Sequence, residues 1–109
     1  ILAKDTPGFV INVILVPYLC DAVRLLEAGV ATKEDIDAGM KLGCGMPMGP
    51  IELLDFVGLD TTLSIAEVLH GEFGDPKYAA PPLLRRMVES GFMGKKCGRG
   101  FYDYTGGGK

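Results

Sequence analysis

Apolar residues recur at helical spacing along most of this chain, and glycine and proline divide the pattern into segments. The first segment, residues 7–28, is apolar around most of its circumference in its first half and amphipathic in its second half. Thr6 is placed to cap this segment, Pro7 suits its first turn, and Gly29 suits its C-terminal cap. The pattern predicts a long helix whose apolar surface is covered by another element, domain or subunit.

Three shorter segments of helical pattern continue the chain. Thr32 is placed to cap the second helix, and Asp35, three residues later, gives an acidic variant of the capping box. Pro50 suits the first turn of a third helix, which Gly58 interrupts. Asp60 is expected to cap the fourth helix, which again carries apolar residues at helical spacing.

The last part of the chain predicts a short fifth helix and a tail. Pro82 opens the helix, after an expected loop over residues 74–81. The segment after this helix has too many glycines to be helical, and Phe101, Tyr102 and Tyr104 are expected to pin it to the surface. No alternation typical of strands is present. We therefore expect an all-α fold, a bundle of about five helices with short connections.

The composition narrows the class of protein. With 48% hydrophobic and 23% charged residues, the chain is typical of one globular domain, residues 1–109. The net charge of −3 favours neither nucleic acid nor a membrane surface as a partner. The apolar run from Phe9 to Cys20 is shorter than the roughly 20 residues that a membrane span needs. Three cysteines without C-x-x-C spacing indicate a reduced, cytoplasmic protein.

The common catalytic constellations are missing. His70, the single histidine, is interpreted as a surface residue late in an amphipathic helix, and we expect no metal site. Two pairs of neighbouring carboxylates are assigned to compensation of helix dipoles in first turns: Asp35 with Asp37, and Glu52 with Asp55. The segment GKKCGRG, residues 94–100, lacks the pattern of a phosphate loop. It is interpreted as a solvated basic turn, and a contribution to binding an anionic ligand stays open.

Asn12 is the one strongly polar side chain in the apolar first half of the long helix, and Pro17 follows in the helix interior. An unsatisfied buried amide costs about 1–3 kcal/mol, and a proline inside a helix costs roughly 3 kcal/mol. Because proline has no N–H, it also leaves the carbonyl of Val13 without its helical partner. Asn12 therefore either bonds to backbone or a facing helix, or points into a cleft and holds a polar atom of a ligand.

The segment GCGMPMGP, residues 43–50, joins the second and third predicted helices. Its glycines permit unusual backbone shapes, its prolines fix the path, and its methionines offer adaptable apolar surface. It is either an elaborate interhelix turn or an apolar wall beside the acyl group of a substrate. The candidate wall residues are Met46, Pro47, Met48 and Pro50.

Three blocks of sequence resemble the C-terminal domain of the 3-hydroxyacyl-CoA dehydrogenases. They are DTPGFVIN at residues 5–12, MGPIELLDFVGLDT at residues 48–61, and GRGFYDY at residues 98–104. The blocks are in the family's order, and the resemblance covers nearly the whole chain. Within the family, the chain is most similar to the short, single-function 3-hydroxybutyryl-CoA dehydrogenases.

The resemblance implies a helical domain, 6-phosphogluconate dehydrogenase C-terminal-like, that follows a Rossmann domain. The chain opens without an initiator methionine or a signal peptide, so we expect it to be cut from a larger protein. The other domain would bind NAD and carry the catalytic His–Glu pair. The whole protein would oxidise (3S)-3-hydroxyacyl-CoA to 3-oxoacyl-CoA in fatty-acid metabolism, including β-oxidation. This chain alone would be inactive, without a cofactor site of its own.

Site residues are carried over from the family in the same way. The resemblance implies that Asn12 contacts the substrate near its C3 oxygen and orients it, and that the segment of Met46, Pro47, Met48 and Pro50 closes the acyl pocket. It also implies a homodimer formed through the helical domain. Two departures bear on these roles: Val13 stands where many relatives have Arg, and Met46 stands where a Tyr is frequent.

Two other functions stay open. One is the helical domain of a related dehydrogenase that acts on hydroxy acids without coenzyme A. The other is a stand-alone helical interaction module.

Overall fold

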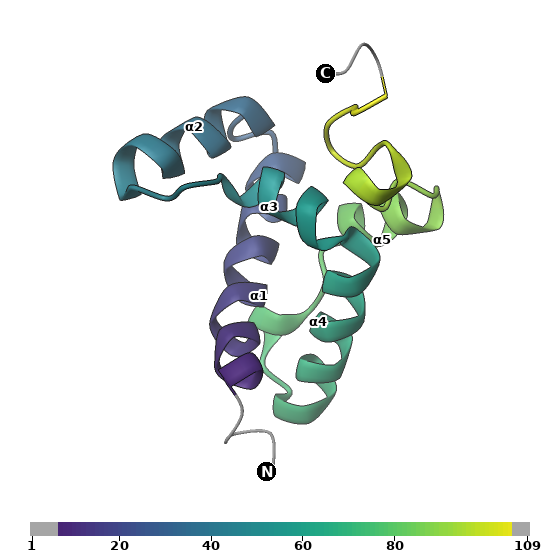
Figure 1. Ribbon diagram of the computed structural model, residues 1–109. Coiled ribbons are helices and arrows are strands. Elements are labelled where there is room, and N and C mark those ends of the chain that lie inside the picture. The colour runs from purple at the N-terminus through teal and green to yellow at the C-terminus, as the bar shows by residue number, and fades with distance from the viewer. Residues whose placement is uncertain (1–6, 106–109) are drawn as a thin grey trace.

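Helices account for all the regular structure in residues 7–105, which are the residues that the computed structural model describes, with side chains from residue 10 onward. The five α-helices are α1 (Pro7–Glu27), α2 (Lys33–Cys44), α3 (Pro50–Val57), α4 (Leu59–Phe73) and α5 (Pro82–Glu89) (Figure 1). Two short 3₁₀-helices are η2 (Pro76–Tyr78) and η3 (Lys95–Cys97). Within this part of the chain no strand forms, and the tail contains only two isolated bridges, which pair Arg99 with Gly94 and with Asp103. The predicted all-α fold with five helices is confirmed.

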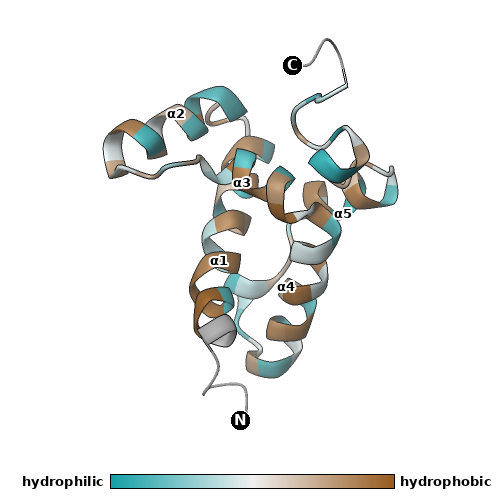
Figure 2. Cartoon of the chain, in the orientation of Figure 1, coloured by the Kyte–Doolittle hydropathy of each residue, from teal (hydrophilic) through white to brown (hydrophobic). Residues whose placement is uncertain are grey.

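The long helix α1 is the centre of the fold. It contacts each of the other four α-helices and η2, and α4 runs beside its N-terminal half in Figure 1. Figure 2 shows brown, apolar stretches of ribbon on α1, α3 and α4. The main core joins α1, α2, α3, α4, α5 and the tail, and its buried members are Leu19, Ala22, Val23, Ile36, Ile51, Leu54, Leu59, Leu63, Leu84 and Phe101. A second cluster between α1, α4 and η2 contains Val16, Cys20, Ala66, Leu69 and Tyr78.

Most helix ends lie where the caps predict them. α1 ends just before Gly29, which has the left-handed φ of +75°. The Thr32 hydroxyl accepts a hydrogen bond of 3.1 Å from the Asp35 N–H and begins α2. Pro50 and Pro82 each occupy the first turn of a helix. The predicted cap at Thr6 lies outside the described residues.

Two local predictions were wrong. Asp60 does not cap α4, because the cap position belongs to Gly58 and Asp60 lies in the first helical turn. There its carboxylate forms a 2.7 Å ion pair with Lys96 from the tail. The expected loop over residues 74–81 contains the 3₁₀-helix η2, and the Asp75 carboxylate accepts a hydrogen bond from the Lys77 N–H at its start.

Candidate functional site

Asn12 lies on the face of α1 that turns toward the protein core. It shares this face with Val16, Leu19 and Val23, which follow it at helical spacing and are buried, whereas Asn12 is half-buried. Its side-chain amide forms no hydrogen bond with any group of residues 10–105. The amide is a donor and an acceptor near the N-terminal end of α1.

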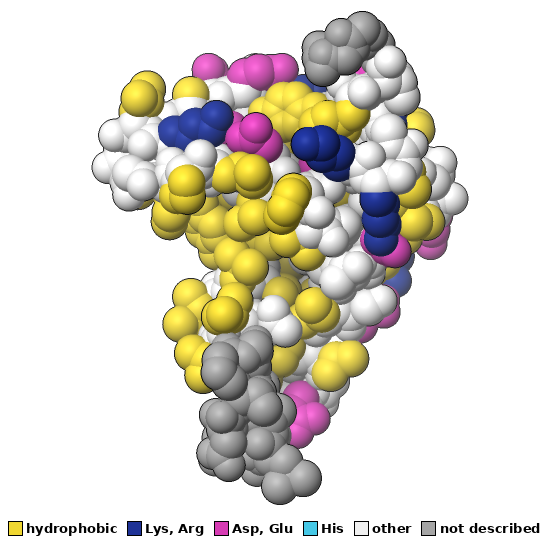
Figure 3. All heavy atoms as spheres, in the orientation of Figure 1, with side chains coloured by type: hydrophobic (Ala, Val, Ile, Leu, Met, Phe, Trp, Pro, Cys, Tyr) yellow, Lys and Arg dark blue, Asp and Glu magenta, His cyan; other side chains and the backbone are white. Residues whose placement is uncertain are grey.

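The segment that joins α2 to α3 forms one side of an apolar hollow of about 500 Å³. Side chains of α1 and α3 form the rest of its lining, and Figure 3 shows hydrophobic side chains gathered over α1 and below α2. The lining residues are Val10, Ile11, Ile14, Leu15, Tyr18, Met46, Pro47, Met48 and Leu53. We call Met46, Pro47 and Met48, the part that follows α2, the Met46–Met48 wall. Its chemistry suits hydrocarbon and little else.

The structure does not bring all the predicted site residues together. Asn12 is not among the residues that line the hollow, although Leu15, which is about 60° around the helix from it, is one of them. Pro50 is fully buried at the start of α3 and lines a smaller hollow beside Tyr18 and Met40. Asn12 therefore lies beside the lining of the hollow, next to Leu15, and not within it.

Tyr18 stands between these two hollows. Its hydroxyl oxygen is buried and has no hydrogen-bond partner within the described part of the chain. Burial, with a smaller contribution from the nearby Cys44 and Asp37, raises the pKa of Tyr18 above its ordinary value. The hydroxyl is thus a neutral group at the edge of the hollow.

Two buried carboxylates, Asp37 and Asp55, hold other segments of the chain by accepting hydrogen bonds from them. The prediction that they compensate helix dipoles in first turns was wrong for both. Asp37, 5% exposed, accepts hydrogen bonds from the N–H groups of Ile51 and Glu52 at 2.8 and 3.1 Å. It therefore caps α3 rather than serving the first turn of its own helix. The Tyr102 hydroxyl donates to the same carboxylate at 2.6 Å.

Asp55 is the second of these carboxylates and is fully buried. It accepts hydrogen bonds from the N–H groups of Phe101 and Tyr102, at 2.8 and 2.9 Å, and from the Tyr104 hydroxyl at 2.8 Å. The tail is therefore fixed by Tyr102 and Tyr104, as predicted, but through hydrogen bonds to buried acids as well as through the buried ring of Phe101.

In the basic turn of the tail, residues 94–100, each cationic side chain contacts another residue of the same chain. Lys96 pairs with Asp60, the Lys95 ammonium lies 6.0 Å from the ring centroid of Tyr104, and the Arg99 guanidinium lies 5.0 Å from that of Phe92. These contacts agree with the interpretation as a solvated basic turn. The arrangement is that of a folded tail rather than a phosphate cradle.

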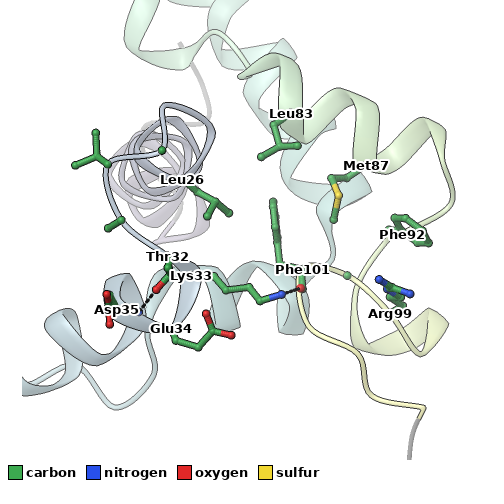
Figure 4. Close-up of a pocket in the computed structure, with 14 residues that line it drawn as sticks. Leu26, Thr32, Lys33, Glu34, Asp35, Leu83, Met87, Phe92, Arg99 and Phe101 are labelled. Atoms are coloured by element: carbon green, nitrogen blue, oxygen red, sulfur yellow. Dashed lines mark hydrogen bonds between the residues drawn. The ribbon is translucent and has the colours of Figure 1, made fainter.

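A second hollow, of about 660 Å³, lies at the opposite end of α1 (Figure 4). Leu26, Leu83 and Met87 line its apolar part, and Lys33 and Arg99 lie at its polar edge. Leu26 is fourteen residues from Asn12, which corresponds to about 21 Å along the helix. This hollow is therefore separate from the candidate substrate residues.

The remaining candidate residues, His70 and the three cysteines, do not form a further site within residues 7–105. His70 is exposed on α4, as predicted. No group of three or more metal-ligating side chains forms among the described residues. Cys44 and Cys97 are exposed thiols, while burial raises the pKa of the Cys20 thiol to about 11. None of the helices in the described part of the chain has the length and apolar character to cross a bilayer.

Comparisons with known proteins match nearly the whole chain. Residues 8–104 match the family model described as "3-hydroxyacyl-CoA dehydrogenase, C-terminal domain". A 3-hydroxybutyryl-CoA dehydrogenase of Mycobacterium tuberculosis is 55% identical over 101 residues, which are 93% of this chain and 35% of that protein. The mitochondrial hydroxyacyl-coenzyme A dehydrogenase of Homo sapiens is 55% identical over 102 residues, 93% of this chain and 32% of that protein.

Solved structures agree with the sequence matches. A crystal structure of (S)-3-hydroxybutyryl-CoA dehydrogenase from Ralstonia eutropha superposes with a TM-score of 0.87 at 52% identity, over 92% of this chain and 35% of that one. A 3-hydroxybutyryl-CoA dehydrogenase from Escherichia coli gives a TM-score of 0.86 at 36% identity, over 95% of this chain and 22% of that one. The chain thus spans about a third of the length of the curated relatives it matches.

Proposed function

The chain belongs to the 3-hydroxyacyl-CoA dehydrogenase family, whose C-terminal domain it matches, and from this premise we propose that it serves a whole protein that oxidises (3S)-3-hydroxyacyl-CoA to 3-oxoacyl-CoA with NAD⁺ as the electron acceptor. The observation that carries the proposal is the match over residues 8–104, together with relatives of that activity at 55% identity. The predicted resemblance to this family is confirmed.

The described residues do not fit a dinucleotide site. Residues 7–105 contain no strand that leads through a glycine-rich turn into a helix, which is the arrangement that cradles the pyrophosphate of NAD. We therefore assign NAD binding and the catalytic acid–base pair to the part of the whole protein that this chain does not span. The role of this chain is to bind and orient the substrate.

Asn12 is the residue of this chain that we assign to the reacting end of the substrate. An amide N–H can donate a hydrogen bond to the C3 oxygen of the hydroxyacyl group and hold that carbon in place. The half-buried position of Asn12 and its lack of a partner among residues 10–105 support this role. The Met46–Met48 wall is assigned to the hydrocarbon part of the acyl chain.

Asn12→Ala in the whole protein is the experiment that tests this role. We expect kcat for (3S)-3-hydroxybutyryl-CoA to fall by about a hundredfold, as for loss of one preorganised donor, while the melting temperature stays within a few degrees. Val13→Ala, one residue along the helix, is the matched control and should keep most of the activity. Unchanged kinetics in Asn12→Ala would reduce Asn12 to a structural residue. NAD-dependent activity of the 109-residue chain alone would contradict the assignment of the cofactor to the rest of the protein.

A homodimer is the second part of the proposal. Ile11 and Ile14 on α1 are 57% and 70% exposed, and Leu25 continues the same exposed side of the helix. A second copy that packs on this side would bury these residues and close the open side of the apolar hollow. Light scattering at micromolar concentration should give twice the mass of one chain of the whole protein, and Leu25→Glu should shift it toward the monomer. A wild-type protein that stays monomeric would contradict this expectation.

A further inference from the structure

The Asp37 carboxylate fixes the end of the Met46–Met48 wall. The first N–H groups of a helix lack partners inside the helix, and at α3 the cap residue is Gly49, which has no side chain to supply one. Asp37 reaches from α2 and accepts from Ile51 and Glu52, three and four residues after the end of the wall at Met48. The start of α3 is therefore tied to α2 by one side chain.

The backbone at Gly49 is pressed against this carboxylate. A Cβ placed on Gly49 would overlap the Cβ and Oδ1 atoms of Asp37, so only glycine allows this approach. At its other end the wall follows the C-terminus of α2, where the Met46 N–H donates to the Met40 carbonyl oxygen at 3.2 Å. The wall is thus a short segment held at both ends. The hydrogen bond from Met46 to Met40 holds its start, and Asp37 holds the backbone that follows it.

Tyr102 holds the Asp37 carboxylate in place from the tail. Its hydroxyl donates to Asp37 Oδ2 at 2.6 Å, and the Lys33 carbonyl oxygen lies 3.2 Å away. The Lys33 ammonium, 5.1 Å from the centroid of the Tyr102 ring, and its 2.7 Å hydrogen bond to the Phe101 carbonyl oxygen fasten the same part of the tail to α2 (Figure 4). A residue 54 positions beyond Met48 in the sequence therefore controls the carboxylate that ends the wall.

We propose that Tyr102, acting through Asp37, is a positioning residue for the Met46–Met48 wall and sets how well the enzyme accepts acyl chains longer than four carbons. The inference rests on the proposed function and deepens it. Each further methylene that lies against the wall contributes about a fourfold gain in binding. A displaced wall therefore weakens binding of a long acyl chain far more than that of a short one.

The test compares two tyrosines in the whole protein. Tyr102→Phe removes the hydroxyl that reaches Asp37, and Tyr104→Phe, the matched control, removes the hydroxyl of another half-buried tyrosine, which reaches Asp55 instead. KM and kcat are measured for (3S)-3-hydroxybutyryl-CoA and for the longest even-numbered (3S)-3-hydroxyacyl-CoA that the wild type oxidises. In Tyr102→Phe we expect KM for the long substrate to rise by about tenfold, KM for the short one by less than about threefold, and kcat to stay within about twofold. Tyr104→Phe should change both KM values by the same small factor.

The outcomes separate this inference from the proposed function. If the wild type oxidises the substrates but Tyr102→Phe changes both KM values equally, or changes them as Tyr104→Phe does, the positioning role is overturned and the proposed function stands. If the wild type oxidises neither substrate, both fail. Asp37→Asn should reproduce the selective loss for the long substrate, and Tyr102→Phe decides the question by itself if that variant does not fold.

Discussion

Replacing Asp55 with alanine is expected to lower the free energy of unfolding by about 4 kcal/mol. The carboxylate is fully buried and accepts three hydrogen bonds, two from backbone N–H groups of the tail and one from the Tyr104 hydroxyl. A hydrogen bond to a charged group is worth about 1.5–3 kcal/mol, and donors left buried without an acceptor keep their desolvation cost. A domain of this length has about 5–15 kcal/mol of stability in total. The loss would thus be between about a quarter and four fifths of the total.

Urea unfolding followed by circular dichroism measures the effect. Asp55→Asn keeps one acceptor oxygen and should give an intermediate loss of about 2 kcal/mol. Asp103→Ala is the matched control, because Asp103 also accepts hydrogen bonds in the tail but is exposed. Its loss should stay below about 1 kcal/mol. A loss in Asp55→Ala no larger than that of Asp103→Ala would show that the buried carboxylate does not hold the tail to the bundle.

The helix boundaries could be predicted because the signals for them are local. Thr32, Pro50 and Pro82 act on the first turn of the helix that they begin, and Gly29 acts on the last turn of the helix before it. Asp60 misled the prediction because the turn at Gly58 is so short that α3 and α4 share it as a cap. Asp is a frequent capping residue, so an Asp two positions after the true cap is easily taken for the cap.

The roles of Asp37 and Asp55 could not be predicted in the same way, because their partners lie far along the chain. The sequence interpretation placed each acid in a first helical turn, where dipole compensation is a sufficient explanation. One signal was present for Asp55. It is the sixth residue of the eight-residue helix Pro50–Val57, close to the C-terminal end, where a negative charge opposes the dipole. A carboxylate at this position therefore needs a stabilising partner other than the helix dipole, and the hydrogen-bond donors of the tail provide it.

The arrangement of the candidate site could also be predicted only in part from the sequence. The family resemblance predicts that Asn12 and the Met46–Met48 wall belong to one site, but sequence motifs do not state which face of a helix a residue occupies. In the structure Asn12 lies on the core side of α1, and the wall lines the apolar hollow together with Ile11 and Ile14. If both contact one acyl-CoA, its C3 oxygen lies toward the core side of α1 and its hydrocarbon end lies in the hollow, with Leu15 on the helix surface between them.

Alkaline pH is expected to unfold this domain through its tail tyrosines. Burial, followed by the hydrogen bonds to Asp37 and Asp55, raises the pKa values of Tyr102 and Tyr104 far above the usual value of about 10. In the unfolded chain both phenols lose their protons near pH 10, whereas in the folded chain they keep them. The unfolded state then binds fewer protons than the native state, so stability falls as the pH rises.

The expected slope is about 1.4 kcal/mol per pH unit for each of the two tyrosines above pH 10, and almost none of this loss occurs below pH 9. Urea midpoints measured between pH 8 and pH 11 give this slope, and ultraviolet absorbance of the phenolate reports when each tyrosine ionises. Tyr104→Phe should lower the slope by the contribution of one tyrosine, while Cys20 and Tyr18, whose pKa values burial also raises, keep their contributions. It also costs some stability at pH 7, because one hydrogen bond to Asp55 is lost. A slope that is the same in Tyr102→Phe, Tyr104→Phe and the wild type would mean that other groups govern alkaline unfolding, and that the two carboxylates do not hold the phenols in their protonated form.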